Sequence, residues 1–258
     1  MTAVRTPASF VPAPGAAPAA RMLGAQTRME FRLMLRNGEQ VGLTLVIPLL
    51  LMVFFNLPLL YSLGADRRID FVVPSIIALA VMSAAFTGIA IATGFERKYA
   101  VIKRLGATAL PRSALIGGKT LAVALLELLQ LVLIGALGFA LAWHPHGEPA
   151  SVVLLVVLGT AAFGGLALLL AGTVRAEITL AAANLIWMVL LFAGGIAIPL
   201  DRFGGAEKVL QYLPSAALSD GLHQVLQHGH ALPAHDLFTL LAWTVVALPL
   251  AARYFRWE

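Results

Sequence analysis

Six long apolar runs constrain the fold of this chain more than any other feature of its sequence. They cover residues 41–61, 71–94, 113–143, 151–174, 178–199 and 237–254. An α-helix needs about 20 apolar residues to cross the core of a bilayer, and each run approaches or exceeds that length. Only 12% of the residues are charged, whereas soluble domains carry about 25%. The sequence therefore predicts an all-α membrane protein, with residues 21–258 forming one domain of six transmembrane helices.

The segment before the first run has a different composition. Residues 1–20 are rich in Ala and Pro and lack the apolar core of about 7 to 15 residues that a secretory signal peptide contains. We therefore expect a disordered cytoplasmic tail, with the first apolar run acting as the insertion signal. The chain has no cysteine, which excludes disulfides and thiolate metal sites.

Basic residues are distributed unevenly between the two sides of a six-span arrangement. Four lie on the side opposite the termini, namely Arg67, Arg68, Arg202 and Lys208. Fourteen lie on the side of the termini, namely Arg5, Arg21, Arg28, Arg32, Arg36, Arg97, Lys98, Lys103, Arg104, Arg112, Lys119, Arg175, Arg253 and Arg256. Because cytoplasmic loops are enriched in Lys and Arg, we expect both termini in the cytoplasm. The six histidines then lie outside.

Residues 21–38 have the pattern of an amphipathic helix. At about 100° per residue its arginines form one stripe, with Leu23, Phe31 and Met34 away from it. The stripe consists of Arg21, Arg28, Arg32 and Arg36. Such a helix suits the cytoplasmic membrane surface, where arginines meet anionic lipid or a partner protein. The alternative is a solvated basic face that precedes the first span.

The segment GGKT at residues 117–120 resembles the end of a phosphate-binding loop. That loop requires a glycine five residues before Gly118, and Ser113 occupies the position. No strand is predicted upstream, so the sequence does not predict nucleotide binding by this chain. Lys119 is instead expected to extend toward the cytoplasm from the start of the third span.

The basic stretch before GGKT has a helical pattern from Glu96 to Leu105. Apolar residues recur three or four positions apart, and Arg97, Lys98, Lys103 and Arg104 flank them. A short helix with an apolar ridge and basic shoulders fits a groove on another protein. The alternative is charge that only fixes the topology. A further short helix, preceded by Pro214 and followed by Gly229, is predicted on the outer side before the last span.

Several of these segments resemble the membrane subunits of type-2 ABC exporters, and in particular the antibiotic-resistance permeases of the daunorubicin type. The resemblance rests on Glu96-Arg97, Lys103-Arg104-Leu105, Ala107-Thr108, Pro111 and Gly118-Lys119 in that order, on FAGGIAIPL at 192–200, and on LPSAALSDGL at 213–222. Ala100, Ala109 and His223 depart from the family pattern, which often has Gly, Pro and Arg at these positions.

The resemblance implies a transport subunit without enzymatic activity that pairs with a second, identical or homologous permease. Two copies of a separate cytoplasmic ABC ATPase would bind ATP and Mg, and this chain would bind no cofactor. A coupling helix at residues 96–108 would dock on the ATPase, and the helix at 21–38 would lie at the membrane interface nearby. The residues expected at the docking interface are Glu96, Arg97, Lys98, Tyr99, Ile102, Lys103, Arg104 and Leu105. The expected cargo is a lipophilic drug, natural product or lipid, and no nucleic acid partner is expected.

Five residues within the apolar runs are candidates for the transport path or for helix packing. They are Glu127, Gln130, Asn184, Gly194 and Gly195. A carboxyl group deep in a bilayer must face protein or water, or carry a proton. Glu127 is therefore either a polar point in the transport path or a neutral hydrogen-bonded group between helices. The histidine pairs 144/146 and 228/230 are interpreted as solvated loop residues rather than metal ligands.

Two other functions are weighed against an ATP-driven permease. A secondary transporter or channel would show internal repeats and several charges near the middle of the bilayer, and one carboxyl group lies there. An intramembrane enzyme would need a polar catalytic cluster within the spans, whereas the histidines are all predicted outside.

Overall fold

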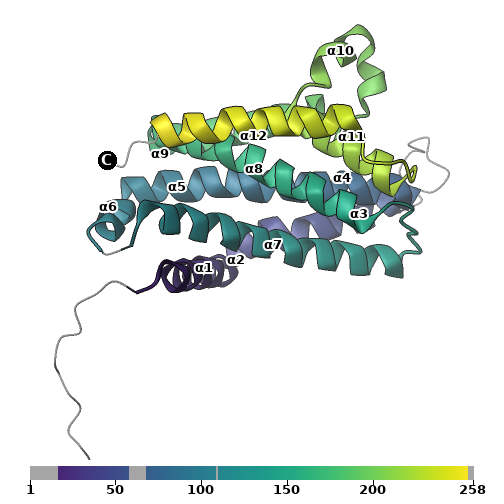
Figure 1. Ribbon diagram of the computed structural model, residues 1–258. Coiled ribbons are helices and arrows are strands. Elements are labelled where there is room, and N and C mark those ends of the chain that lie inside the picture. The colour runs from purple at the N-terminus through teal and green to yellow at the C-terminus, as the bar shows by residue number, and fades with distance from the viewer. Residues whose placement is uncertain (1–16, 58–67, 109, 255–258) are drawn as a thin grey trace, which may run out of the picture.

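The computed structural model of the chain describes residues 17–57, 68–108 and 110–254, and the regular elements within these ranges are all helices (Figure 1). Five described helices are long and apolar enough to cross a membrane: Arg68–Lys98, Ser113–Ala140, Pro149–Thr173, Ala176–Ala193 and Ala234–Tyr254. This confirms the predicted all-α membrane protein. The predicted tail lies almost wholly outside the described ranges, and the first helix, α1 (Ala19–Arg36), begins two residues before the predicted start.

The first apolar run forms a shorter helix than predicted. It contains α2 (Gly38–Val41), the π-helix η1 (Gly42–Val46) and α3 (Ile47–Asn56), of which Thr44–Asn56 is the apolar part. The predicted span extends to residue 61, and its last four residues lie outside the described part of the chain. Pro48 lies in the first turn of α3 and has no N–H to donate within the helix, which fits the change from π-helix to α-helix at this point.

The second predicted span is one continuous helix that is longer than expected. It consists of α4 (Arg68–Met82), the π-helix η2 (Ser83–Gly88) and α5 (Ile89–Lys98). The next spans are α7 (Arg112–Ala140), α8 (Pro149–Thr173), α9 (Ala176–Ala193) and α12 (Ala234–Tyr254). Their bounds agree with the prediction to within a few residues, except that α9 ends six residues early. It ends there because Gly195 has a left-handed backbone with φ of 72°, which turns the chain away from the helix.

The outer segment contains the 3-10 helix η3 (Leu200–Ala206), α10 (Glu207–Leu210) and α11 (Pro214–Leu226). In Figure 1, η3 and α10 project sideways from one end of the bundle. The helix predicted after Pro214 is α11. Most of its residues are buried against α4, α8 and α12.

The long helices pack side by side, and α8 lies in the middle of them (Figure 1). Small residues allow the close contacts of α8. A Cβ atom at Gly165 would lie 2.8 Å from the Cβ of Ala247, so α8 and α12 approach too closely there for any side chain. The fully buried side chains include Phe86, Phe163 and Leu218.

The two ends of the bundle differ in charge. One end carries Arg97, Lys98, Lys103, Arg104 and Arg175, and we call it the basic end. The opposite end carries His144, His146, His228 and His230, and we call it the histidine end. Helix α1 lies beside α7 near the basic end, on the flank of the bundle rather than across its tip (Figure 1).

Candidate functional site at the basic end

The helix predicted from Glu96 to Leu105 is interrupted. Helix α5 ends at Lys98, and a separate short helix, α6 (Val101–Gly106), follows. Between them Ala100 has φ of 55° and ψ of 25°, a left-handed conformation that stops the first helix and starts the second in a new direction. The prediction of one helix over this stretch was therefore wrong, and Glu96, Arg97 and Lys98 belong to the end of a membrane-spanning helix.

The residues after the break form an exposed surface at the tip of the bundle. Lys98, Tyr99, Val101, Lys103 and Arg104 are exposed, and we call them the coupling surface. Tyr99 is 61% exposed and stacks on Phe95, with 6.2 Å between the ring centroids. Leu105 is half-buried, and the side chain of Ile102 lies outside the described part of the structure. The surface combines three cations with two apolar side chains, and its role in binding a partner stays a prediction.

Arg97 points into the protein rather than toward solvent. Its guanidinium group donates to the carbonyl of Ala171, and to that of Val174 at 3.2 Å. These carbonyls lie at the end of α8, where helix carbonyls lack partners within the helix and the dipole favours a cation. Arg97 therefore fixes α5 to the end of α8.

Lys98 joins α5 to the start of α9. Its Nζ lies 2.5 Å from a carboxylate oxygen of Glu177, and both side chains are exposed. A cleft of about 600 Å³ lies beside this pair, lined also by Thr173 and Ile178. Helices α5 and α9 approach closely beside this cleft. A Cβ atom at Gly94 in α5 would lie only 3.3 Å from Thr179 in α9. Residues at the base of the coupling surface therefore contact two other membrane helices, α8 and α9.

A buried charge cluster lies behind the coupling surface. The Nζ of Lys119 lies 2.7 Å from Oε1 of Glu96 and 3.2 Å from Oε2 of Glu30. Nε2 of Gln26 donates to the other oxygen of Glu30 at 2.8 Å. The cluster therefore connects α1, α5 and α7.

Lys119 does not extend toward the cytoplasm as predicted, because it is only 6% exposed. Two carboxylates hold its ammonium group inside the protein, and a buried charge of this kind is stable only when it is paired. Glu96, predicted at the docking interface, points to Lys119 instead, and its side chain is 23% exposed.

The glycines of GGKT form the seat on which α1 rests. A Cβ atom at Gly118 would lie 2.5 Å from Cγ of Gln26, and one at Gly117 would lie 3.1 Å from Leu23. No larger residue fits at Gly118 without moving α1. These glycines lie within α7 and not in a loop after a strand, so their geometry is that of helix packing and not of a phosphate-binding loop.

The arginines predicted on the interfacial helix are all exposed, namely Arg21, Arg28, Arg32 and Arg36. Met34 is buried, and Leu23 and Phe31 are half-buried. The sequence pattern did not reveal Glu30, which is the single acid of α1 and lies on the buried side. Its isolation among arginines is the only signal that the sequence offers.

Glu127 and Gln130 lie in the middle of α7, away from the basic end. Oγ1 of Thr160 in α8 donates to Oε2 of Glu127 at 2.5 Å, and Glu127 is 3% exposed. Nε2 of Gln130 donates to the carbonyl of Thr44 at 2.6 Å. Both side chains thus connect α7 to neighbouring helices.

The remaining candidates lie on and after α9. Asn184 is exposed, and its Nδ2 donates to the carbonyl of Leu180 at 3.0 Å. A Cβ atom at Gly194 would lie 1.9 Å from Oγ of Ser215, so α11 packs directly on this backbone. The carbonyl of Gly195 accepts a hydrogen bond from Ser219 at 3.1 Å. The two glycines therefore join the end of α9 to α11.

A family model described as "ABC-2 family transporter protein" matches residues 66–253, which is well over half of the chain. The chain belongs to the ABC-2 transporter family. This confirms the resemblance to a type-2 ABC permease, and the permease is a transport subunit of the membrane. The match covers the coupling surface, Glu96 and Lys119, whereas α1 with Glu30 precedes it. No curated protein matches the permease.

Proposed function

We propose that this permease is the membrane half of an ATP-driven exporter and that a separate cytoplasmic ABC ATPase docks on its coupling surface. The proposal places the basic end and both termini in the cytoplasm, and the protein in the inner membrane of a bacterium. The excess of Lys and Arg near the basic end supports this orientation. The ATPase would bind ATP and Mg, and this chain would bind neither and catalyse no reaction.

The observation that carries the proposal is that the coupling surface is exposed while the residues behind it are fixed to other helices. Arg97 connects its base to α8, Lys98 connects it to α9, and Glu96 connects it through Lys119 to α7 and α1. A force applied at the coupling surface therefore passes to α7, α8 and α9 through the polar contacts of the three residues at the end of α5, and through Lys119 to α1. Closure of two ATPases would then move the inner ends of two paired permeases, identical or homologous, and switch access to the other side.

The proposed cargo is a lipophilic drug, natural product or lipid. The surfaces of the long helices support this class, because the large side chains that they expose are mostly apolar, as at Leu128, Leu185 and Val245. A path along such surfaces offers little to a hydrophilic cargo. Multidrug efflux and antibiotic resistance are the corresponding biological roles.

The test is co-purification of the permease with the ABC ATPase encoded beside it, followed by ATPase and transport assays in liposomes. Changing Lys103→Glu and Arg104→Glu together should reduce both the bound ATPase and the ATP hydrolysis that depends on the permease, because the surface loses its positive charge. The matched control is Arg202→Glu with Lys208→Glu, which changes two exposed basic residues near the opposite end.

Equal loss in both variants would show a general effect of charge and would contradict the docking site. Transport by the permease alone, in liposomes without any ATPase, would instead establish the secondary transporter or channel. The two results are distinguishable. The first contradicts the site at which the ATPase docks, and the second contradicts ATP as the energy source.

A further inference from the structure

We propose that His146, His228 and His230 at the histidine end of the bundle form a binding site for a divalent transition-metal ion such as zinc. The three residues come from two loops, since His146 follows α7 and the other two follow α11. In the sequence they belong to two separate pairs, and only the fold brings them together. The binding itself does not depend on the ATPase or on the direction of transport.

The turn that ends α11 fixes the backbone of His228 and His230. Between them Gly229 has φ of 66°, the left-handed conformation that commonly follows the end of a helix. The N–H of His230 donates to the carbonyl of Gln224 at 2.9 Å, and the N–H of His228 donates to the carbonyl of His223 at 3.2 Å. The two histidines therefore start from defined positions at the end of one helix.

His146 lies against the same turn. Its backbone N–H donates to the carbonyl of Leu226, the last residue of α11, at 3.2 Å. A Cβ atom at Gly229 would lie 3.1 Å from the Cβ of His146. Because Gly229 separates His228 from His230 in the sequence, His146 is held beside the point between them.

The rings of His228 and His230 have a separation that suits binding to one ion. Their centroids are 5.7 Å apart, and their planes are inclined by 31°. Two imidazoles that bind one tetrahedral zinc at about 2.0 to 2.1 Å have ring centroids roughly 5 Å apart. Among the described residues no three His, Asp or Glu side chains already surround one point, so the ring of His146 must rotate to complete the site. All three side chains are exposed, which leaves them free to do so.

Gln224 prepares the ring of His230 for a metal. Nδ1 of His230 lies 2.7 Å from Oε1 of Gln224. An amide oxygen can only accept, so Nδ1 carries the proton and donates it, and the lone pair for a metal lies on Nε2. Histidines that bind metals usually donate their other ring N–H to an oxygen in this way, which fixes the tautomer and the orientation of the ring. Gln224 is therefore a positioning residue of the site.

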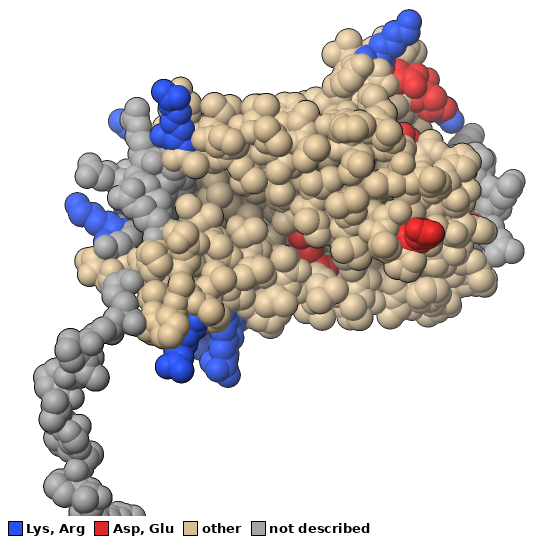
Figure 2. Space-filling model, viewed as in Figure 1, with Lys and Arg blue, Asp and Glu red and all other residues tan. Residues whose placement is uncertain are grey.

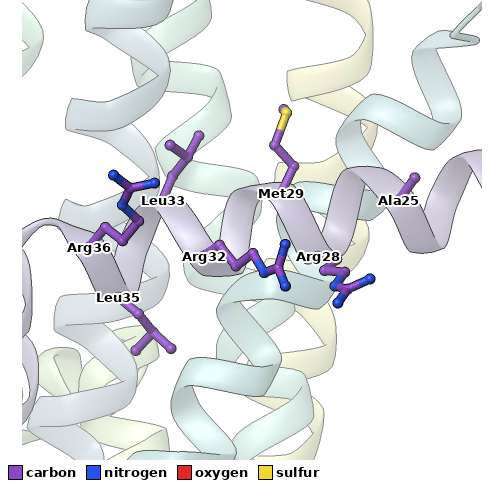
Figure 3. Close-up of a pocket in the computed structure, with 7 residues that line it drawn as sticks. All are labelled: Ala25, Arg28, Met29, Arg32, Leu33, Leu35 and Arg36. Carbon is purple, nitrogen blue, oxygen red and sulfur yellow. The ribbon is translucent and has the colours of Figure 1, made fainter.

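The charge of the molecule favours a cation at this end. The Lys and Arg side chains visible in Figure 2 gather at the basic end, on the flank beside α1 and on the segment that projects with η3 and α10. The groove on α1 is lined by Arg28, Arg32 and Arg36 (Figure 3), and such a surface repels a metal ion. The histidine end offers imidazole nitrogens and the C-terminus of α11, which carries a partial negative charge. Imidazole suits zinc, copper and nickel, whereas calcium and magnesium prefer oxygen ligands.

A bound ion would join two loops of the permease. One loop leads from α7 to α8, and the other leads from α11 to α12. The ion would therefore restrict relative movement of these four helices at the histidine end, and zinc should slow transport. This effect on transport rests on the proposed function, whereas the binding of the ion does not.

The binding test titrates zinc chloride into the full chain in detergent, with isothermal titration calorimetry as the readout. Any purification tag must be removed, because a polyhistidine tag binds the same metals. The wild-type chain should bind one zinc ion, and changing His228→Gln and His230→Gln together should abolish saturable binding. His146→Gln should weaken binding by about tenfold or more, since losing a ligand costs at least as much as losing the partner of a ligand. The matched control is His235→Gln, which replaces an exposed histidine near the start of α12 and should leave the affinity unchanged.

Gln224 has a test of its own. Gln224→Leu keeps all three histidines but removes the acceptor for Nδ1 of His230, so it should weaken zinc binding by roughly tenfold to a hundredfold. Gln224→Glu keeps an acceptor and should retain the binding. Equal affinity of the leucine variant and the wild type would contradict the assigned tautomer.

Four results would overturn the proposal. They are the absence of saturable zinc binding to the wild-type chain, binding that survives in the double variant, equal loss in His235→Gln, and unchanged affinity in His146→Gln. The last result would remove the link between the two loops. Without zinc, the histidine variants should unfold at the temperature of the wild type, because the replaced side chains are exposed.

A second measurement does not depend on the calorimetry. Zinc should raise the unfolding temperature of the wild-type chain and not that of the double variant, because an ion that binds only the folded protein stabilises it. A rise of equal size in both would overturn the site. Failure of the ATPase to bind the permease would contradict the proposed function and leave the zinc titration unchanged, so the two proposals fail independently.

Discussion

Ala100 holds a backbone conformation that suits glycine better than any residue with a side chain. Its φ of 55° lies in the left-handed region, where a Cβ atom crowds the following carbonyl oxygen at a cost of about 1 to 2 kcal/mol. The break between α5 and α6 depends on this conformation. The protein therefore stores local strain at the base of the coupling surface.

We expect Ala100→Gly to raise the free energy of unfolding by about 0.5 to 1 kcal/mol, since the strain that it relieves exceeds the extra backbone entropy of glycine. Thermal unfolding in detergent measures the change. The control is Ala107→Gly, at a position with an ordinary φ of −82°, where glycine should not stabilise. A lower unfolding temperature for Ala100→Gly than for the wild type would contradict the assignment of strain.

The conformations and contacts of single residues were harder to predict from the sequence than the positions of the helices. The sequence of the basic stretch repeats apolar residues at helical spacing and contains no Gly or Pro between Glu96 and Leu105, so nothing local signals the break at Ala100. Likewise, the contact of Gln130 with Thr44 spans 86 positions. Such contacts follow from how helices pack, which residue patterns along one helix do not encode.

Among the helices, α1 is fixed to the bundle by charge as well as by shape. Lys119 in α7 binds Glu30 in α1 and Glu96 in α5, and the glycines beside it let α1 approach. The ion pairs join residues that are 89 and 23 positions apart in the sequence. The pattern along α1 predicted an amphipathic helix with its arginines on one face, but the inward direction of Glu30 required the position of α7.

We predict that Lys119→Met destabilises the protein by about 3 kcal/mol, because it leaves two carboxylates without their buried partner. Adding Glu30→Gln and Glu96→Gln should recover much of the loss, since the triple variant holds no uncompensated charge. Thermal unfolding of the single and triple variants measures this coupling. Lys208→Met, at an exposed position near the histidine end, is the control and should change stability little. Equal stability of Lys119→Met and the control would show that the cluster contributes nothing.

At the scale of the whole molecule, the order and length of the helices were predictable because lipid imposes a minimum length on each apolar run. The five long helices lie close to their predicted positions, and α11 follows its proline as expected. The burial of α11 could not be predicted, since its sequence is only moderately apolar. Its side chains are held by contacts such as that between Nε2 of His223 and Oγ of Ser75 in α4, at 3.1 Å.

His223 should contribute stability that is lost as the pH drops below neutral. Burial lowers the pKa of His223 below its ordinary value of 6.5. The unfolded chain binds a proton near pH 6.5, whereas the folded protein resists protonation until a lower pH. The stability that His223 contributes is therefore complete above pH 6.5 and decreases below it, by up to about 1.4 kcal/mol per pH unit, until the folded pKa is reached.

Unfolding temperatures at pH 7.5 and pH 5.5 measure this effect. His223→Gln should reduce the difference between the two values, because glutamine does not titrate. Asp220 and His228 also act electrostatically on His223, so the variant should reduce the difference without abolishing it. His230→Gln, at an exposed position, should leave it unchanged. An identical pH effect in both variants would rule out His223 as a cause.

The contact of α1 with Gly117, Gly118 and Lys119 of α7 also constrains the order of assembly during synthesis. Glu30 leaves the ribosome 89 residues before Lys119, and the glycines of the seat emerge with that lysine. Until α7 is inserted, the polar side of α1 lacks both Lys119 and the glycine surface of α7 against which it packs. The contacts between α1 and α7 can therefore form only after the third span has been synthesised. The N-terminal helix can therefore reach its final position only after the third span is complete.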